Sequence, residues 1–199
     1  NAGEEGFNHA FNTLHGIHTA LEKKKSDVSL SQKFDGSPSI VFGHNPENGK
    51  FFVASKSAFN VNPKLNYAPE DIEKNHGHAP GLVHKLKIAL QHLPKVTPKE
   101  GVYQGDVMHT PEDHKHTDGR IEFTPNTITY SVKKGSGEAK KLLGSKIGVA
   151  VHTAYHGKTL QDMKAQYNPS LSHFGDHKDV HLMHSTYPTS CLLYTSDAA

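Results

Sequence analysis

The stretch Lys33-Phe34-Asp35-Gly36 lies between two segments whose patterns are typical of β-strands. Before it, residues 28–32 alternate apolar and polar side chains, as a half-buried strand does. After it, residues 39–43 form the mostly apolar run Ser-Ile-Val-Phe-Gly. The pattern therefore predicts a lysine and a carboxylate at a strand end, beside a glycine that lets a ligand approach the backbone because it has no Cβ.

This tetrapeptide has two interpretations. A lysine held beside a carboxylate can act as a nucleophile once its ammonium group loses a proton. The alternative is a surface lysine followed by an ordinary Asp-Gly turn between two strands. The features that follow along the chain are needed to decide between them.

The composition predicts one domain without a membrane partner. The chain has 199 residues, enough for one sizeable core, and its 22 basic and 20 acidic residues give a net charge of +2. A nucleic-acid partner would therefore need a local basic surface. Because no apolar run is long enough to cross a bilayer and no secretory signal is visible, we expect a cytoplasmic location.

Both ends of the sequence have unusual features. The chain starts with Asn1 rather than methionine, and residues 190–199 resemble translated read-through of a sequencing adapter. We therefore expect a partial, truncated domain over residues 1–189 and a non-native tail over residues 190–199. The single cysteine, Cys191, falls in that tail, and one cysteine excludes an internal disulfide framework.

The chain contains 17 histidines, and several of them form close pairs along the sequence. These pairs are His15/His18, His76/His78, His114/His116 and His152/His156. A zinc site needs three or four converging ligands. Because most of the histidines lie in polar stretches between periodic segments, we expect a pH-dependent surface charge rather than a metal centre.

The periodicity along the chain predicts an α+β domain with mostly antiparallel strands. Helices are expected at residues 5–25, 82–93 and 138–143. Strands are expected at residues 40–42, 51–53, 101–108, 121–123, 128–132 and 146–153. A polar loop with Pro63 and Pro69 as breakers is expected before the second helix, and residues 161–189 are polar and poorly periodic.

Four motifs follow one another along the chain: KFDG at 33–36, ASKS at 54–57, YQGD at 103–106 and KIGVAVHTAYHGKTL at 146–160. This succession resembles the nucleotidyltransferase superfamily of ATP-dependent DNA and RNA ligases and mRNA-capping enzymes, over about residues 28–165. It is also similar to an uncharacterised family of proteins from large tailed phages that shares this ligase-like core. The resemblance implies a ligase-like α+β fold, with ATP-grasp-like antiparallel sheets flanked by helices.

The resemblance gives the first motif a catalytic role. Lys33 would attack the α-phosphorus of ATP and expel pyrophosphate, and Asp35 would orient it. Gly36 would let the nucleotide lie close to the backbone. Ser37 would also belong to the nucleotide site, and the Gly-Ser pair is similar to that of some RNA ligases.

The later motifs would complete the nucleotide site. Lys56 matches a phosphate contact that is usually arginine in DNA ligases, although lysine lacks the bidentate fork. Asp106 matches an acidic residue that meets the ribose or a metal-bound water, and its oxygens suit Mg²⁺. Val151 and His152 fall near the aromatic-acid pair that packs on adenine. The structural alternatives are an exposed lysine, a carboxylate at a bulge or turn, and a core histidine.

The resemblance therefore implies an enzyme that forms lysyl-AMP from ATP and Mg²⁺ and passes AMP to a 5′-phosphate of RNA or DNA, in a phage-infected bacterium. Two other functions stay open: a phage protein that holds nucleotide or nucleic acid without chemistry, and a structural protein of the phage particle. The Glu-Gly strand and the K-x-K strand that ligases carry are not visible before residue 190. That fits truncation and also loss of activity.

Overall fold

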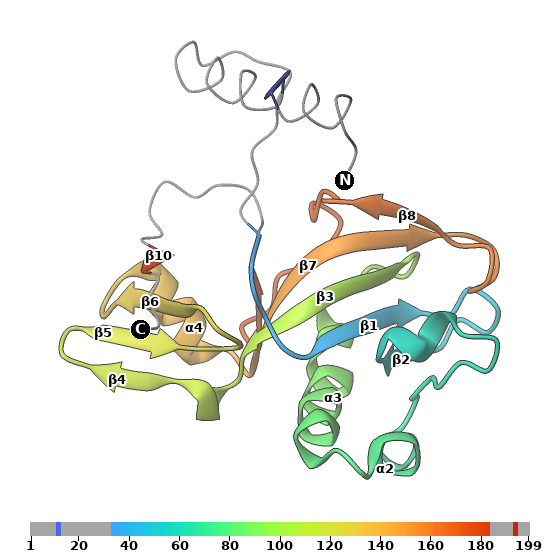
Figure 1. The fold of residues 1–199 in the computed structure, drawn as a ribbon, viewed down its shortest axis with the longest axis horizontal. Coiled ribbons are helices and arrows are strands. Elements are labelled where there is room, and N and C mark those ends of the chain that lie inside the picture. Colours follow the sequence, from blue (N-terminus) through green and yellow to red (C-terminus); the bar gives the residue numbers. More distant parts are fainter. Residues whose placement is uncertain (1–10, 13–32, 184–192, 195–199) are drawn as a thin grey trace. The chain divides into compact units, whose positions relative to one another are not determined.

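The computed structural model describes residues 11–12, 33–183 and 193–194, and the chain divides into two units, residues 1–33 and 34–199 (Figure 1). In the first unit Phe11 and Asn12 are helical. The rest of the helix expected over residues 5–25, and the strand expected over residues 28–32, lie outside the described residues. All further elements belong to the second unit.

The second unit is built on a six-stranded sheet with the order β2-β1-β3-β7-β8, in which β9 also pairs with β7 (Figure 1). The strands are β1 (Ser39–His44), β2 (Phe51–Ala54), β3 (Val102–His109), β7 (Ile147–His156), β8 (Lys164–Tyr167) and β9 (Val180–Met183). Every pair is antiparallel except β7–β9, which is parallel. The long strand β7 pairs with β9 along its first half and with β8 along its second half.

The hairpin between β1 and β2 follows from its turn residues. Gly49 adopts a φ of 70°, which glycine reaches without a steric penalty. The side chain of Asn45 accepts a hydrogen bond from the backbone of Glu47 at 2.9 Å. The predicted strands at residues 40–42 and 51–53 are therefore confirmed.

Two helices, α2 (Pro69–His76) and α3 (Pro80–His92), lie on one side of this sheet (Figure 1). Pro69 is the first residue of α2, so the expectation of a loop broken at this proline is wrong. A proline fits the first helical position because its missing N–H would have no intrahelical partner there. Asp71 then accepts hydrogen bonds from the N–H groups of Tyr67 and Ala68 and stabilises the start of α2.

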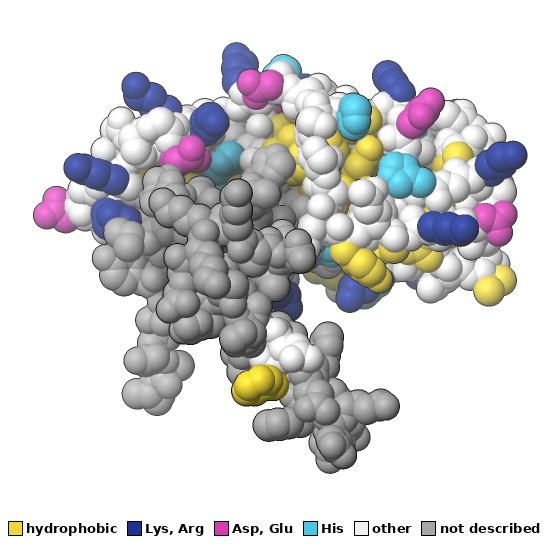
Figure 2. Space-filling model, turned by 90° about the horizontal axis from the view of Figure 1, so that it is seen from above, with side chains coloured by type: hydrophobic (Ala, Val, Ile, Leu, Met, Phe, Trp, Pro, Cys, Tyr) yellow, Lys and Arg dark blue, Asp and Glu magenta, His cyan; other side chains and the backbone are white. Residues whose placement is uncertain are grey.

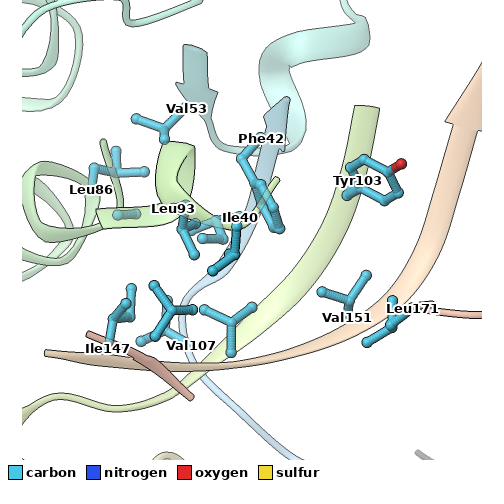
Figure 3. Packing of buried hydrophobic residues seen from close by; sticks show 14 of the residues in the cluster. Ile40, Phe42, Val53, Leu86, Leu93, Tyr103, Val107, Ile147, Val151 and Leu171 are labelled. Carbon is cyan, nitrogen blue, oxygen red and sulfur yellow. The ribbon is translucent and has the colours of Figure 1, made fainter. Parts of the chain in front are cut away.

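The main hydrophobic core lies between the sheet and α3 (Figure 3). The sheet contributes alternate residues, as its period of two requires. These core residues include Ile40, Phe42, Val53, Tyr103, Val107, Ile147 and Val151 from the strands, with Leu86 from α3 and Leu93 at its end. The 3-10 helix η2 (Leu93–Lys95) follows α3, so Pro94 ends the α-helix as the sequence predicted.

A smaller sheet packs beside the first one, with the order β10-β6-β5-β4. Its strands are β4 (Lys115–Thr117), β5 (Arg120–Phe123), β6 (Thr129–Lys133) and β10 (Leu193–Tyr194). The helix α4 (Gly137–Gly144) follows β6, and the Ser136 hydroxyl caps it by accepting from the Ala139 N–H at 3.1 Å. A second core joins Phe34 and Met108 to Phe123, Tyr130 and Leu142.

The predicted α+β class with mostly antiparallel strands is confirmed. The sequence missed β8 and β9 in the segment expected to be irregular. All four residues of β8 are exposed, so no apolar alternation marks it. No helix among the described residues is long and apolar enough to span a bilayer.

Candidate functional site

Two β-bulges shape the pairing of the central strands β3 and β7. Gln104 pairs with Thr153 and Gly105 with Val151, so His152 is an extra residue on β7. Val107 pairs with Val149 and His109 with Gly148, so Met108 is an extra residue on β3. Because a bulge bends its strand and turns side chains to new directions, each one places a polar side chain where regular alternation would not.

The first bulge belongs to a polar strip on the sheet face opposite α3. We define this polar strip as Ser39, Gln104, Asp106, His152, Thr153 and Tyr155. The Gln104 amide donates to the Ser39 hydroxyl at 3.2 Å and accepts from the Tyr155 hydroxyl at 2.6 Å. These bonds fix the amide between β1 and β7.

The other half of the polar strip is less constrained. His152 Nε2 lies 3.7 Å from Asp106 Oδ1, which is longer than a direct hydrogen bond. His152 Nδ1 lies 2.7 Å from the Thr153 hydroxyl, which orients the ring. The side chains of His152 and Asp106 are 41% and 20% exposed, so both reach solvent. A carboxylate in this setting is available to a ligand.

Apolar clusters flank the polar strip on both sides. One contains Val41, Phe52, Ala58, Val102 and Leu160, and the ring of Phe59 packs on that of Tyr155 at 4.5 Å. The other is the second core, to which Met108 and Ala150 contribute from the six-stranded sheet. The strip is therefore a polar band on the sheet between two buried apolar clusters.

The KFDG segment runs directly beside β3 at Asp106. A Cβ on Gly36 would lie 2.6 Å from the Asp106 Cβ and 2.9 Å from the Val107 carbonyl oxygen. Ser37, which is exposed, donates its N–H to Val107 O at 3.1 Å, and Val107 donates to Pro38 O at 2.9 Å. The missing Cβ of Gly36 thus permits close approach to β3, and the structure places Gly36 of KFDG beside Asp106 of YQGD.

Asp35 is anchored to the loop between β5 and β6. Its carboxylate accepts from the Asn126 amide at 3.0 Å and from the Thr127 hydroxyl at 2.7 Å. Its backbone N–H donates to the Tyr130 hydroxyl at 2.9 Å. Asp35 therefore fixes the KFDG backbone to the second sheet, which is a positioning role.

Both candidate lysines are exposed. Lys33 is the last residue of the first unit and directly precedes the buried Phe34. Lys56 begins the 3-10 helix η1 (Lys56–Phe59), in which Ala58 packs into the cluster beside the polar strip. The Ser55 hydroxyl caps η1 by accepting from the Ser57 N–H. The helix η1 thus packs on the same face of the sheet as Asp106, and Lys56 is exposed at its start.

Val151 does not join this group. Its side chain is 3% exposed and lies in the main core on the α3 side (Figure 3). It therefore cannot contact a nucleotide bound at the polar strip. For His152 the alternative of a core histidine is wrong, because the bulge turns this side chain toward Asp106 and solvent.

The described residues contain no group of three or more His, Cys, Asp or Glu side chains that could hold a metal ion. Asp106 offers one carboxylate beside the hydroxyl and amide groups of the strip. Mg²⁺ commonly binds one or two protein carboxylates and takes its other oxygens from water and substrate phosphates. Asp106 fits that mode of binding.

Sequence reasoning missed a buried chain of histidines at the second bulge. His109 Nε2 lies 3.0 Å from His181 Nδ1, and His109 Nδ1 lies 3.0 Å from His114 Nε2. The far nitrogen of His181 lies 3.8 Å from Glu138. We call His114, His109 and His181 the histidine chain. Burial, followed by nearby His181 and His114, lowers the pKa of His109 to about 2.

The expectation that most histidines contribute surface charge does not hold for His76, His92 and His109, all of which are buried. For His109 the signal lay in the sequence, because it directly follows the strand residues Val107 and Met108. A polar residue that ends a buried strand needs a partner. One partner, His181, comes from β9, which the sequence did not predict, and the other, His114, lies five residues further along the chain.

The described part of the chain is thus an α+β protein with two mostly antiparallel sheets and a polar strip on the face of the larger one opposite α3. A family model described as a family of unknown function (DUF6267) matches residues 1–195, and the chain belongs to this family. No curated protein and no solved structure is found to match it.

Proposed function

We propose that this protein is a nucleotidyltransferase of the polynucleotide-ligase type, which forms lysyl-AMP at Lys33 from ATP and passes AMP to a nucleic-acid 5′-phosphate. The observation that carries the proposal is the contact between Gly36 and Asp106, whose Cβ positions would lie 2.6 Å apart. It joins two motifs that are distant in sequence on one face of the sheet. The antiparallel pairing of β1 with β3, in which Ser39 lies opposite Asp106, holds the two motifs in this position.

In the proposed first step the Lys33 amine, after losing its proton, attacks the α-phosphorus of ATP. A nitrogen–phosphorus bond forms, the bond to the bridging oxygen breaks, and pyrophosphate leaves with the electron pair. In the second step an oxygen of a 5′-phosphate attacks the same phosphorus, and the nitrogen–phosphorus bond breaks. Bound Mg²⁺ would neutralise charge on the triphosphate.

The polar strip has the residue types that this chemistry needs. Asp106 would meet the ribose or a water bound to Mg²⁺. The half-exposed ring of His152, oriented by Thr153, would lie against the base or the ribose. Gln104, fixed by Ser39 and Tyr155, would give a rigid amide for hydrogen bonding. Lys56 would contact a phosphate as a point charge.

This function implies nucleic-acid partners and a place in the cytoplasm of a phage-infected bacterium. The visible described surface supports no general attraction for nucleic acid, because basic and acidic side chains are interspersed around it (Figure 2). A nucleic-acid partner would therefore need a local basic surface on the second unit.

The test is covalent labelling of the purified protein with α-³²P-ATP and Mg²⁺, followed by a denaturing gel. We expect an acid-labile AMP adduct that is lost in Lys33→Ala and kept in Lys50→Ala, a control at another exposed lysine. If no adduct forms with any divalent metal, the proposal is wrong.

The same samples separate the two alternatives. ATP binding that survives Lys33→Ala without an adduct would indicate a binding module. A melting temperature that neither ATP nor oligonucleotide changes would indicate a structural or interaction role.

A further inference from the structure

A groove lies between the second sheet, α4 and the segment that leads into β9. Its volume is about 1220 Å³, and no residue of the polar strip lines it. Its apolar lining includes the half-buried side chains of Val132, Leu182 and Met183, together with Phe123, Tyr130 and Leu142 of the second core, which are at most 2% exposed. The groove is thus a separate concave surface with an apolar base (Figure 1 shows α4 beside β6).

The groove concentrates positive charge. Its lining contains five cationic side chains, Arg120, Lys133, Lys140, Lys141 and Lys178. The acidic side chains that line it are Glu138 and Asp176. The net charge of the lining, with histidine neutral, is therefore +3, whereas the whole chain carries +2. These cations come from β5, β6, α4 and the loop before β9, so they surround the groove rather than follow one helix.

Most of these cations are available to a ligand. Among the described residues, the four lysines of the groove form no ion pair, and all four are exposed. In the described part of the chain, lysines without an ion pair also occur outside the groove, for example Lys50 and Lys64, so what distinguishes the groove is that its lysines gather around one concave surface. Unpaired cations around a concave surface favour an anionic ligand.

The distribution of charge around the groove favours a polymer. The groove's volume of about 1220 Å³ is close to the upper end of the range of about 300–1,000 Å³ that is usual for small-molecule sites, so the charges rather than the volume indicate the class of ligand. Cations on several elements suit repeated phosphates, and an apolar base suits the faces of unpaired bases. A duplex would hide its bases and use only the cations.

We propose that this groove binds single-stranded nucleic acid, with the four lysines on phosphates and the bases toward the apolar base. This inference does not depend on chemistry at Lys33. Its test therefore omits ATP, and its failure would leave the proposed adenylation untouched.

The experiment measures binding of a fluorescein-labelled oligothymidylate of about 12 nucleotides by anisotropy, at salt concentrations from about 50 to about 200 mM. We expect the Lys140→Ala/Lys141→Ala variant to bind about tenfold more weakly. Its slope of log affinity against log salt should be less steep by about 1.4, since two phosphate contacts are lost. Lys133→Ala/Lys178→Ala, on other elements, should behave in the same way.

The matched control is Lys50→Ala/Lys64→Ala, which removes two exposed lysines outside the groove and should leave affinity and slope unchanged. Equal losses in the control and in the groove pairs would overturn the proposal, as would no binding by the unmodified protein at the lowest salt. Tighter binding of a duplex of equal length would show that bases do not contact the groove and would also overturn it.

Discussion

At one bulge of the β3–β7 pair, His152 lies beside Asp106 and both side chains reach solvent. At the other bulge, Met108 is the extra residue, and the following His109 is fully buried between His181 and His114. A bulge thus leaves one polar group in contact with solvent and buries another on the same two strands. We call the bulge at His152 the open bulge and the bulge at Met108 the closed bulge, and we call His152 with Asp106 the open group and His109 with its two histidine partners the closed group. The open group has unused hydrogen-bonding capacity, whereas the closed one has its partners within the fold.

The closed group has a consistent direction of hydrogen bonding. If His181 points its Nε2–H toward Glu138, its Nδ1 accepts from His109 Nε2, and His109 Nδ1 accepts from His114 Nε2. His109 and His114 then each donate from Nε2, whereas the 3.8 Å from His181 Nε2 to Glu138 is too long for a direct hydrogen bond. Because the buried His109 has a partner at each ring nitrogen, we expect the histidine chain to act in folding, whereas the polar strip is the proposed ligand site.

The largest effect is expected at the closed bulge. A Cβ on Gly148 would lie 2.1 Å from His109 Nε2, and the buried ring has no room to move. Gly148→Ala should therefore lower the free energy of unfolding by about 3 kcal/mol, measured by urea denaturation. Gly81→Ala is the control, since nothing lies within 4 Å of its added Cβ. A loss below about 1 kcal/mol would contradict the tight closed bulge.

A substitution at the open bulge should change the proposed activity rather than the free energy of unfolding. Asp106→Asn keeps the shape of the side chain and should change the free energy of unfolding by less than about 0.5 kcal/mol. Formation of the AMP adduct should slow by about 100-fold, because a charge that acts on the reacting groups is lost. Asp118→Asn, at an exposed position outside the strip, should change neither. If Asp106→Asn strongly lowers the free energy of unfolding but leaves the rate of adduct formation unchanged, the role of Asp106 is structural.

Much of the six-stranded sheet was predictable because its strands have clear apolar patterns. The strands at β1, β2, β3 and β7 and the helices α3 and α4 match the predicted positions closely. The sequence failed where the pattern is weak: β8 is fully exposed, and β9 has four residues. It also failed at α2, where Pro69 begins a helix that a simple breaker rule excludes.

The candidate site was predictable as a set of motifs but not as geometry. Periodicity alone places Val151 and His152 on opposite sides of the sheet, but it cannot show which of the two side chains lies on the same side as Asp106. The pairing of β3 with β7 decides this, and its bulge turns His152 outward. The contact of His109 with His181 could not be predicted, because the parallel pairing of β9 with β7 that brings His181 there has no local sequence signal.

The next prediction concerns the pH dependence of stability that arises from the buried His109. The pKa of His109 is about 2 in the folded state, below the 6.5 of an ordinary histidine. As the pH falls below 6.5 the unfolded chain takes up a proton that the folded protein excludes, so stability decreases with acidification. His109 alone should lower the free energy of unfolding by about 2 kcal/mol between pH 7 and pH 5.

Burial also lowers the pKa values of His181 and His114, which adds to this loss. The check is urea denaturation at pH 7, 6 and 5. His109→Gln cannot take up this proton and should flatten the profile by up to about 1.4 kcal/mol per pH unit. His116→Gln, at an exposed position, should keep the profile of the unmodified protein. An unchanged slope in His109→Gln would show that His109 is not the neutral buried group.

The smallest effect tests how strongly the polar strip is preorganised. Tyr155→Phe removes the hydroxyl that donates to Gln104 at 2.6 Å, while Ser39 still accepts from the same amide. We expect a loss of about 1 kcal/mol in the free energy of unfolding, the usual net value of one hydrogen bond. Tyr167→Phe is the control, because that ring is 77% exposed. If Tyr155→Phe destabilises the protein as much as Gly148→Ala, the polar strip is a structural network like the histidine chain, and the contrast between the two bulges fails.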